Sequence, residues 1–214
     1  MKVAEPTIER LVQYYRLLTQ LKEEGRRVIS SQEIGEMLGL KASQVRKDLS
    51  YFGEIGKRGV GYHVDRLHDH VSKILSHPNV WRIGLVGVGR LGEALLGHKS
   101  LRSDKFGIEA VFDVDPNKVG KMIEGVPCFH VDDMPKILRE KKIEIIILTV
   151  PAQAAQQAVD KAVASGVVRG ILSFATAPLV VPPDVLVYGV DIAAELEKLL
   201  FYLKSSAGKE AKNK

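Results

Sequence analysis

The chain has 214 residues, of which 45% are hydrophobic and 27% are charged, and its formal net charge at pH 7 is +5. This balance is typical of a globular protein of one or two domains and excludes a chain that is disordered throughout. The positive charge is compatible with nucleic-acid binding, but a basic surface is also a common means of staying soluble. The positions of the basic residues in the sequence are therefore needed to distinguish nucleic-acid binding from a basic surface that only keeps the protein soluble.

The sequence contains one cysteine, Cys128, which excludes an intrachain disulfide and a cysteine-based zinc cluster. We interpret it as a small core residue and predict no metal site. The longest apolar run, Ile143–Val150, is much too short to span a membrane, and Glu144 interrupts it. The N-terminus lacks the apolar stretch of a signal peptide. We expect a cytoplasmic protein that does not contact membranes.

Helical periodicity dominates the residues before position 77. Apolar residues recur at three- and four-residue steps from Thr7 to Glu24 and predict a helix there. A short second helix starts after Ser30, because Ser30 and Glu33 form a capping box, and it ends at Gly39, which readily adopts a left-handed turn. The residues predicted to face the core from this second helix are Ile34, Met37 and Leu38. A further helix is predicted over Asp65–Ser76.

A third helix follows Gly39 and divides its residues between two faces. The apolar face consists of Val45, Leu49 and Phe52. The opposite face is small and cationic, and it consists of Ser43, Arg46, Lys47 and Ser50. The glycine-rich segment 53–62 comes next and predicts a tight hairpin with Lys57 and Arg58 at its tip.

Two short helices, a glycine-containing turn between them and a basic hairpin are typical of a winged helix-turn-helix unit that binds duplex DNA. Arg46 and Lys47 are candidates for contacts with base edges or nearby phosphates. Lys57 and Arg58 are candidates for a minor groove or the backbone, and Gly59 would allow close approach. Further polar contacts are predicted for Ser43, Gln44, Ser50, Tyr51 and Tyr62. From the residues alone, an ordinary solvated face stays open as the alternative.

The period changes after His77-Pro78-Asn79, which is the best linker candidate in the chain. Short β-rich runs then alternate with helical segments, and this predicts a parallel sheet covered by helices. The predicted strands are Val80–Val86, Glu109–Phe112, Ile143–Val150, Val168–Ser173 and Val185–Tyr188. The predicted helices are Leu91–Leu101, Met134–Lys141, Ala152–Ser165 and the amphipathic Ile192–Lys204. The fold class is α/β, with a DNA-binding domain at 1–77, a nucleotide-binding domain at 78–190, a C-terminal helix at 191–204 and a flexible tail at 205–214.

The glycine pattern of dinucleotide-binding proteins is matched by Gly87, Val88, Gly89, Arg90, Leu91 and Gly92. The pattern alone is weak, but here it follows a predicted strand, opens a predicted helix and precedes Asp113 by about 20 residues. Gly87 would permit a tight turn, Gly89 would let the backbone approach the pyrophosphate, and Gly92 would pack the helix on the strand. Asp113 suits the ribose hydroxyls of NADH or NAD⁺ and disfavours a 2′-phosphate, although Lys118 leaves this open. The alternative for Asp113 is a plain turn residue.

Two further segments follow predicted strands at the same edge of the sheet. Ligands in such sheets bind beyond the carboxyl ends of the strands. Thr149 ends the third strand there, and an apolar surface for the nicotinamide ring is predicted from Val150, Pro151, Phe174 and Ala175. For each of these residues, an ordinary turn residue is the alternative.

Distinctive motifs occur at 29–34, 44–53 and 56–62, where the sequence reads ISSQEI, QVRKDLSYFG and GKRGVGY. Together with Gly87–Gly92, Phe112-Asp113 and Val190-Asp191, they make the chain resemble the Rex family of bacterial redox-sensing transcriptional repressors throughout its length. The resemblance implies a homodimer that binds palindromic operator DNA in promoters of respiratory and fermentative genes. It also implies that NADH binding closes the dimer and releases the DNA, whereas NAD⁺ competes without driving release.

The resemblance implies roles for the end of the chain as well. Ile192–Lys204 would be a swapped helix that packs between the two domains of the partner subunit. The family's DNA-contacting positions are matched by Arg46, Lys47, Lys57 and Arg58. Asp191 matches a position tied to the switch, and His98 replaces a tyrosine of many relatives, so both are candidate switch residues. Many relatives have Asn-Phe-Ala-Pro where this chain has Ser173–Thr176, so we expect the polar network around the nicotinamide to differ.

Two other functions stay open at this stage. An NAD-dependent oxidoreductase would need a substrate domain and a proton-transferring residue near the nicotinamide. The part after Asn79 has little room beyond the nucleotide fold, and its two histidines, His98 and His130, sit in no catalytic pattern, so we predict no catalytic residue. A CoA-binding module is the second alternative, because Pro151–Gly166 resembles segments of CoA-binding domains. Asp113 argues against CoA, since it suits a free pair of ribose hydroxyls.

Overall fold

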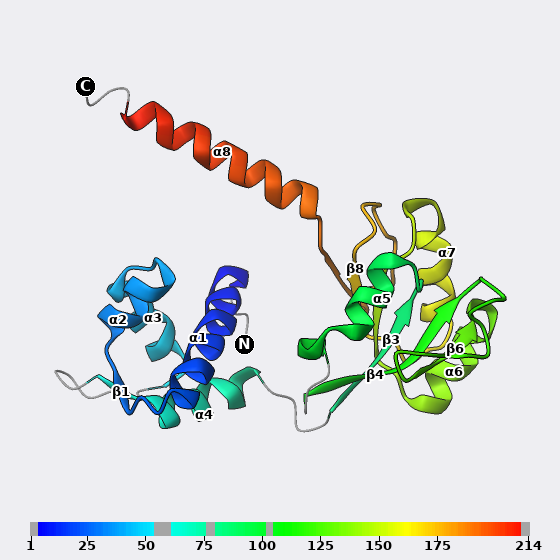
Figure 1. The fold of residues 1–214 in the computed structure, drawn as a ribbon, viewed down its shortest axis with the longest axis horizontal. Coiled ribbons are helices and arrows are strands. Elements are labelled where there is room, and N and C mark those ends of the chain that lie inside the picture. The colour runs from blue at the N-terminus through cyan, green and yellow to red at the C-terminus, as the bar shows by residue number, and fades with distance from the viewer. Residues whose placement is uncertain (1–3, 54–60, 76–79, 102–104, 211–214) are drawn as a thin grey trace. The chain divides into compact units, whose positions relative to one another are not determined.

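The computed structural model describes residues 4–53, 61–75, 80–101 and 105–210. The chain divides into two compact units, Met1–Pro78 and Asn79–Lys214 (Figure 1). The described residues of each unit have their own buried core. The tip of the predicted hairpin, with Lys57, Arg58 and Gly59, lies outside the described residues, as does the predicted linker at 77–79.

The described part of the N-terminal unit contains four helices and one short antiparallel pair of strands. The helices are α1 (Glu5–Glu23), α2 (Ser31–Leu38), α3 (Ala42–Tyr51) and α4 (Val64–Leu75). The strands are β1 (Val28–Ile29) and β2 (Tyr62–His63). All four predicted helices are confirmed, with small shifts at their ends. The pairing of β1 with β2 brings the chain after the glycine-rich segment back beside the start of the helix-turn-helix.

The predicted ends of α2 are confirmed at the level of single hydrogen bonds. The backbone N–H of Glu33 donates to the hydroxyl of Ser30 at 3.1 Å, and the backbone N–H of Ser30 donates to the carboxylate of Glu33 at 2.8 Å. Gly39 ends the helix with φ = +68°, a conformation that glycine adopts without steric cost. These local signals place the turn between α2 and α3 where the sequence predicts it.

One large cluster of buried residues forms the core of the N-terminal unit. Its fully buried members include Leu11, Tyr14, Leu18, Leu21, Ile34, Val45, Leu67 and Val71. The prediction that Met37 faces this core is wrong, because its side chain is 50% exposed. The inner stripe of α2 runs along Ile34, Gly35 and Leu38. At 100° per residue, Met37 lies roughly 100° from the centre of that stripe.

The C-terminal unit contains a seven-stranded sheet within the described residues. The strands are β3 (Trp81–Val86), β4 (Phe106–Asp113), β5 (Met122–Ile123), β6 (Val126–His130), β7 (Ile145–Leu148), β8 (Gly170–Ser173) and β9 (Leu186–Gly189). Their order is β5-β6-β4-β3-β7-β8-β9, and all neighbours are parallel except β5 and β6. The predicted parallel sheet is confirmed, and the direction of winding reverses between β3 and β7, which is where such sheets bind ligands.

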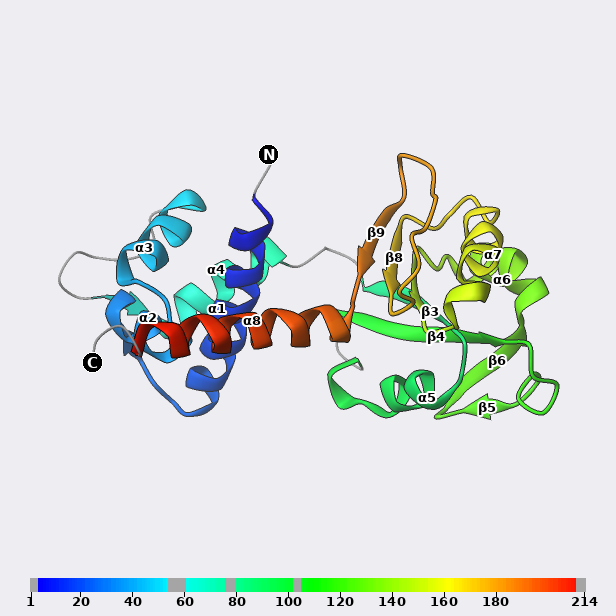
Figure 2. The same cartoon turned by 90° about the horizontal axis from the view of Figure 1, so that it is seen from above.

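Helices cover both faces of this sheet (Figure 2). They are α5 (Arg90–Gly97) on one face and α6 (Met134–Lys141) and α7 (Ala152–Val163) on the other. Alternate strand residues point to the two faces, so Phe112 and Leu148 pack with α6 and α7, whereas Leu85 and Val111 pack on the side of α5. Cys128 is buried in the latter cluster as a free cysteine, as predicted for a core residue.

Three parts of the C-terminal unit differ from the predictions. The helix predicted over Leu91–Leu101 ends at Gly97, and a 3₁₀ turn at Lys99–Leu101 follows it. Strands β5 and β6 were not predicted, because β5 has only two residues and β6 contains a proline. The last helix, α8 (Ile192–Glu210), continues into the segment 205–214 that was predicted as a tail. The run from Ser205 to Glu210 is polar, but it contains no proline to stop a helix.

Candidate functional site

The loop after β3 is shaped by two glycines that no larger residue can replace without strain. Gly87 has φ = +92°, and a Cβ atom on it would lie 2.7 Å from the side chain of Val150. A Cβ atom on Gly92 would lie 2.2 Å from the carbonyl oxygen of Gly87. The chain therefore needs glycine at both positions for its own packing.

Gly89 differs from its two neighbours in the motif. It is the N-cap residue of α5, and a Cβ atom built on it would meet no atom within 4 Å in the described structure. Packing within the protein therefore gives no reason for a glycine here. The space beside Gly89 is open at the start of a helix, where backbone N–H groups and the helix dipole favour an anion.

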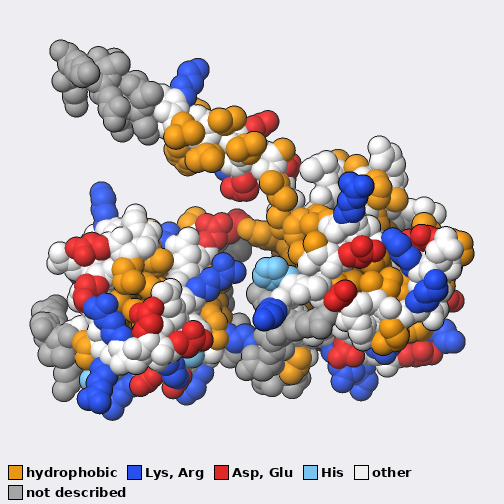
Figure 3. Space-filling model, in the orientation of Figure 1, with side chains coloured by type: hydrophobic (Ala, Val, Ile, Leu, Met, Phe, Trp, Pro, Cys, Tyr) orange, Lys and Arg blue, Asp and Glu red, His pale blue; other side chains and the backbone are white. Residues whose placement is uncertain are grey.

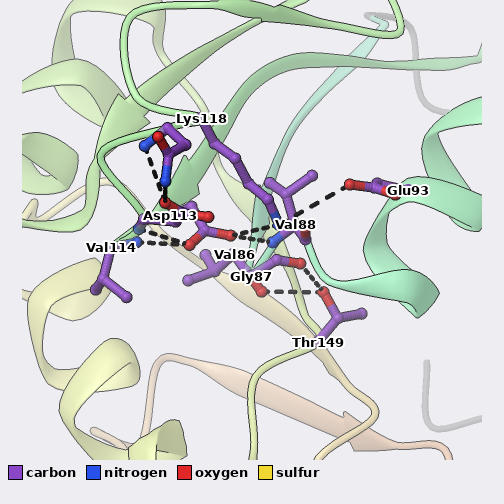
Figure 4. Close-up of polar contacts among 10 residues, drawn as sticks. Val86, Gly87, Val88, Glu93, Asp113, Val114, Lys118 and Thr149 are labelled. Carbon is purple, nitrogen blue, oxygen red and sulfur yellow. Dashed lines mark hydrogen bonds and ion pairs between the residues drawn. The ribbon is translucent and has the colours of Figure 1, made fainter.

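Asp113 ties the end of β4 to the glycine loop (Figure 4). One carboxylate oxygen accepts a hydrogen bond from the backbone N–H of Val88 at 2.7 Å. The other accepts from the backbone N–H groups of Val114 and Asp115 at 2.8 and 2.9 Å. The residue thus organises its own turn and also holds the loop between Gly87 and Gly89. Asp113 is therefore both a turn residue, which was the alternative interpretation from the sequence, and a residue that contacts the glycine motif.

Lys118 brings a positive charge to the same place. Its ammonium group donates to the carbonyl oxygen of Val88 and lies 3.9 Å from a Glu93 oxygen and 4.0 Å from an Asp113 oxygen (Figure 4). Two carboxylates therefore offset the charge of the lysine. The hydroxyl of Thr149, at the end of β7, lies 2.6 Å from the carbonyl oxygen of Gly87, to which it donates a hydrogen bond.

These residues surround a cavity of about 400 Å³ at the carboxyl ends of β3, β4 and β7. Of the predicted nucleotide-site residues, its lining includes Gly87, Gly89, Asp113, Lys118, Thr149, Val150 and Pro151. The lining does not include Val88, Arg90, Leu91, Gly92, Phe174 and Ala175. Arg90 and Leu91 are exposed on the first turn of α5, and Gly92 is buried beneath the loop. Phe174 and Ala175 follow β8 and pack against the two hydrophobic clusters of the sheet.

One wall of this cavity comes from α7 and was not predicted. Ala154, Ala158 and Lys161 line it together with Gln157, at the spacing of a single helix face. Because the sequence predicts this helix, the three- and four-residue spacing of these side chains could have indicated that they share its inner face. The ammonium group of Lys161 is held by the carboxylate of Asp132, which lies just after β6.

The cationic face predicted on α3 is confirmed as an exposed surface. Ser43, Arg46, Lys47, Ser50 and Tyr51 are exposed, whereas Val45 and Leu49 are buried behind them. Arg46 donates to the hydroxyl of Ser31 at 3.0 Å, which links the exposed faces of α3 and α2. Tyr62 is half-buried in β2. Gln44 differs from the others, because its amide N–H donates to the carboxylate of Asp48 at 2.8 Å.

Asp48 itself is a buried carboxylate that sequence reasoning missed. It accepts two hydrogen bonds from Arg10, at 2.6 and 2.9 Å, and one from the hydroxyl of Tyr14 at 2.8 Å. Burial acts to raise the pKa of Asp48, but the hydrogen bonds from Arg10, Tyr14 and Gln44 outweigh it and hold this pKa below its usual value. Burial and the bond to Asp48 raise the pKa of Tyr14. A signal existed, since Asp48 lies three residues after Val45 on the predicted apolar side.

The candidate switch residues lie at helix ends. His98 is exposed at the C-terminus of α5. Asp191 precedes α8, and its carboxylate accepts hydrogen bonds from the backbone N–H groups of Ala193 and Ala194 at 2.9 and 3.1 Å. It therefore caps the helix. The side chains of α8 that are more than half exposed include Ile192, Leu196, Leu199, Leu200, Phe201, Tyr202 and Leu203 (Figure 3).

Residues 4–53, 61–75, 80–101 and 105–210 contain no group of three or more His, Cys, Asp or Glu side chains placed to hold a metal ion. The helices of the described residues include no candidate for a membrane-spanning segment.

The fold and the two sites define a protein class in which a helix-turn-helix unit with an exposed cationic face is joined to a dinucleotide-binding type of parallel sheet. Family models match both parts: "Putative DNA-binding protein N-terminus" over residues 2–50 and "CoA binding domain" over residues 79–177. The chain belongs to the Rex family of redox-sensing transcriptional repressors, because it is 40% identical to the Rex repressor of Listeria welshimeri over 97% of this chain and 96% of the relative. The Rex repressor of Desulfitobacterium hafniense is 45% identical over 94% of this chain and 95% of its own length.

Solved structures agree with this assignment over the whole chain. A structure described as "Crystal structure of RSP in complex with beta-NAD+ and operator DNA" matches with a TM-score of 0.89 and 32% identity, covering 100% of this chain and 99% of that one. The same protein in complex with beta-NADH matches with a TM-score of 0.88 and 30% identity, over 99% of each chain. The predicted family and fold class are confirmed. The likeness to CoA-binding segments is also present, as the second family model shows for the sheet.

Proposed function

We propose that this chain is a redox-sensing transcriptional repressor that binds operator DNA as a dimer and releases it when NADH binds. The observation that carries the proposal is that one chain combines the exposed cationic face of α3 with a glycine loop whose Asp113 borders a cavity. The related RSP structures, with operator DNA and NAD⁺ and with NADH, support this pairing of partners. Since its partner is DNA, we expect the protein to work in the cytoplasm.

For the nucleotide, we assign the residues as the sequence predicts. Gly89 and the first turn of α5, with Arg90 and Leu91, would face the pyrophosphate. Asp113 would accept hydrogen bonds from the adenosine ribose, with the loop held by Gly87, Val88, Gly92 and Lys118. The nicotinamide side is assigned to Thr149, Val150, Pro151, Phe174 and Ala175. NADH bound there carries a neutral ring and NAD⁺ a cationic one, so residues on this side would distinguish the two.

For DNA, we assign Arg46 and Lys47 to the major groove and nearby phosphates. Additional contacts are assigned to Ser43, Gln44, Ser50, Tyr51, Lys57, Arg58, Gly59 and Tyr62. Gln44 would contact DNA through its carbonyl oxygen or its second amide N–H, because one N–H is already bonded to Asp48. The unit at 1–77 would thus bind DNA, and the unit at 78–190 would bind NADH and NAD⁺ and sense their ratio.

The dimer is assigned to α8. Its apolar side chains are exposed in the single chain (Figure 3). A second copy of the chain would cover them. Asp191, at the start of this helix, and His98, at the end of α5, are the proposed switch residues. We propose that the chain acts as a regulator without catalysis, since its relatives are transcriptional repressors.

CoA is a second candidate ligand, because the sheet matches the family model of a CoA-binding domain. The carboxylate of Asp113 favours NADH, since it suits a free pair of ribose hydroxyls and repels a phosphate on the ribose. Thermal unfolding in the presence of NADH, NADPH or CoA separates these ligands, because only a ligand that binds the folded state raises the midpoint. NADH is expected to give the largest rise.

The central experiment starts with an operator that the protein itself selects from a pool of randomised duplexes. A gel shift on that duplex is then titrated with NADH and separately with NAD⁺, and only NADH is expected to release the DNA. The double variant Arg46→Ala and Lys47→Ala should lose the shifted band and keep its NADH affinity. Linkage requires that DNA weakens NADH binding by the same factor. Equal NADH affinity with and without operator would refute the coupling.

A further inference from the structure

Asp48 places a negative charge in the middle of the helix that presents the cationic face. Its side chain is only 3% exposed. Arg10 donates to both of its oxygens, at 2.6 and 2.9 Å, and Tyr14 donates its hydroxyl at 2.8 Å. Both donors belong to α1, 38 and 34 residues earlier in the sequence. The network therefore connects α3 to the longest helix of the described N-terminal unit.

Apolar packing alone gives α3 a weak rotational constraint. Its fully buried apolar side chains are Val45 and Leu49, and hydrophobic contact has no preferred direction. A guanidinium that contacts both oxygens of a carboxylate does have a preferred plane and direction. With Asp48 held inward, the helix repeat turns Ser43, Arg46 and Ser50 roughly 140–160° away from it, which is outward.

We propose that Asp48 and Arg10 are positioning residues for DNA recognition: the ion pair of the buried Asp48 with the partly exposed Arg10 sets the rotation of α3, and thereby points Arg46 and Lys47 toward the groove. This inference rests on the proposed function as a DNA-binding repressor. Asp48 and Arg10 act through the helix and need not touch the nucleic acid. Gln44 completes the network from α3 itself, which explains why its amide is turned inward.

The decisive variant is Asp48→Asn, because electrostatics and positioning predict opposite results for it. Removing a negative charge from α3 would strengthen binding to a polyanion if charge alone mattered. If the ion pair positions the helix, operator affinity of the folded protein falls at least tenfold. The slope of log affinity against log salt concentration also becomes shallower, by about one for each phosphate that the protein no longer neutralises. Affinities are measured with the full chain on the duplex selected by the wild type, with NADH titrated in parallel as a measure of the intact sensor unit.

Two further variants separate positioning from stability. Arg10→Lys keeps the charge but loses the planar fork, so it is expected to weaken operator binding without a change in net charge. Val71→Ala, a truncation in the buried face of α4, is the matched control: it lowers the unfolding midpoint but leaves the operator affinity and salt slope of the folded protein unchanged. Arg10→Lys also serves as the test should Asp48→Asn fail to fold.

Each outcome has one meaning. This inference is overturned if the wild type binds the operator and folded Asp48→Asn or Arg10→Lys binds it equally well or more tightly. The proposed function would then remain intact. An equal loss of affinity in Val71→Ala overturns it as well, because destabilisation alone would then suffice. If the wild type selects no duplex, the proposed function fails and this inference fails with it.

Discussion

In the N-terminal unit the key carboxylate, Asp48, points into the core and the candidate contact residues point outward, whereas in the C-terminal unit Asp113 itself borders the cavity. Asp48 is bonded to side chains of another helix, and Asp113 is bonded to backbone N–H groups of its own turn and of the glycine loop. The first unit therefore presents a surface of side chains on a rigid helix. The second presents a concave site at the carboxyl ends of strands, next to a glycine loop that Asp113 holds through a backbone N–H group.

The two kinds of site should tolerate different changes. A side-chain surface is altered by replacing the exposed residues, and the core behind it survives. The loop beside the cavity depends on glycines, because Gly87 and Gly92 are needed for the close approach of this loop to its neighbours. Substitutions that compare the two units, or two glycines within one unit, test this contrast.

The largest effect is expected for Gly92→Ala. The added Cβ atom would lie 2.2 Å from the carbonyl oxygen of Gly87, so we expect the C-terminal unit to lose about 3 kcal/mol of stability and to lose NADH binding with it. The matched control is Gly89→Ala, whose Cβ atom meets nothing within 4 Å in the described structure. Its unfolding midpoint should fall far less than that of Gly92→Ala, while NADH affinity falls at least tenfold. Fluorescence of Trp81, the only tryptophan, follows the unfolding of this unit. Equal destabilisation by both variants would contradict the contrast.

Asp113→Asn is expected to weaken NADH binding by about 1.5–3 kcal/mol, or roughly 10- to 150-fold, because it removes a charged hydrogen-bond acceptor. NADPH affinity should fall less or rise, since the repulsion of a 2′-phosphate disappears and Lys118 remains 4.0 Å from this position. The ratio of the two affinities, measured by fluorescence titration, is the readout. An unchanged ratio would argue that Asp113 serves only its turn.

The pH dependence of stability tests the buried carboxylate of the N-terminal unit. The pKa of Asp48 in the folded protein lies below the ordinary value near 4, so the ion pair contributes stability above that pH and loses it as the pH falls through the folded pKa. Denaturant unfolding followed by circular dichroism at pH 7 and at about pH 3 measures this loss. In Asp48→Asn, the part of the acid-dependent loss of unfolding free energy that comes from Asp48 should be absent. Identical pH profiles of variant and wild type would show that Asp48 is not the source of the acid-dependent loss of stability.

The smallest effect is expected for the cap of α2. Ser30→Ala removes the hydroxyl that accepts from the backbone of Glu33, which should cost about 1 kcal/mol of stability in the N-terminal unit. Ser43→Ala, on the exposed face of α3, is the control for stability and should change it by less than about 0.5 kcal/mol. Chemical denaturation of the two variants side by side distinguishes a cap from a surface serine. Equal midpoints would show that the cap contributes nothing measurable.

Much of the fold could be predicted because its signals are local. The capping box at Ser30, the left-handed glycine at Gly39 and the alternation of strands and helices after position 79 each lie within a short window of sequence, and the structure confirms them. The same holds for the cationic face of α3, which follows from the 100° helix repeat. Gly87 and Gly92 could be predicted as tight positions from their spacing after a strand.

Contacts between distant residues were decided only by the tertiary structure. The pairing of Arg10 with Asp48 spans 38 residues, and the wall that α7 adds to the cavity depends on how that helix packs over the ends of the strands. The exposure of Met37 depends on which stripe of a short helix meets its neighbours. Sequence periodicity determines which residues share a face, because backbone geometry repeats along the chain. What that face meets is set by the packing of whole elements, and no short window of sequence contains that information.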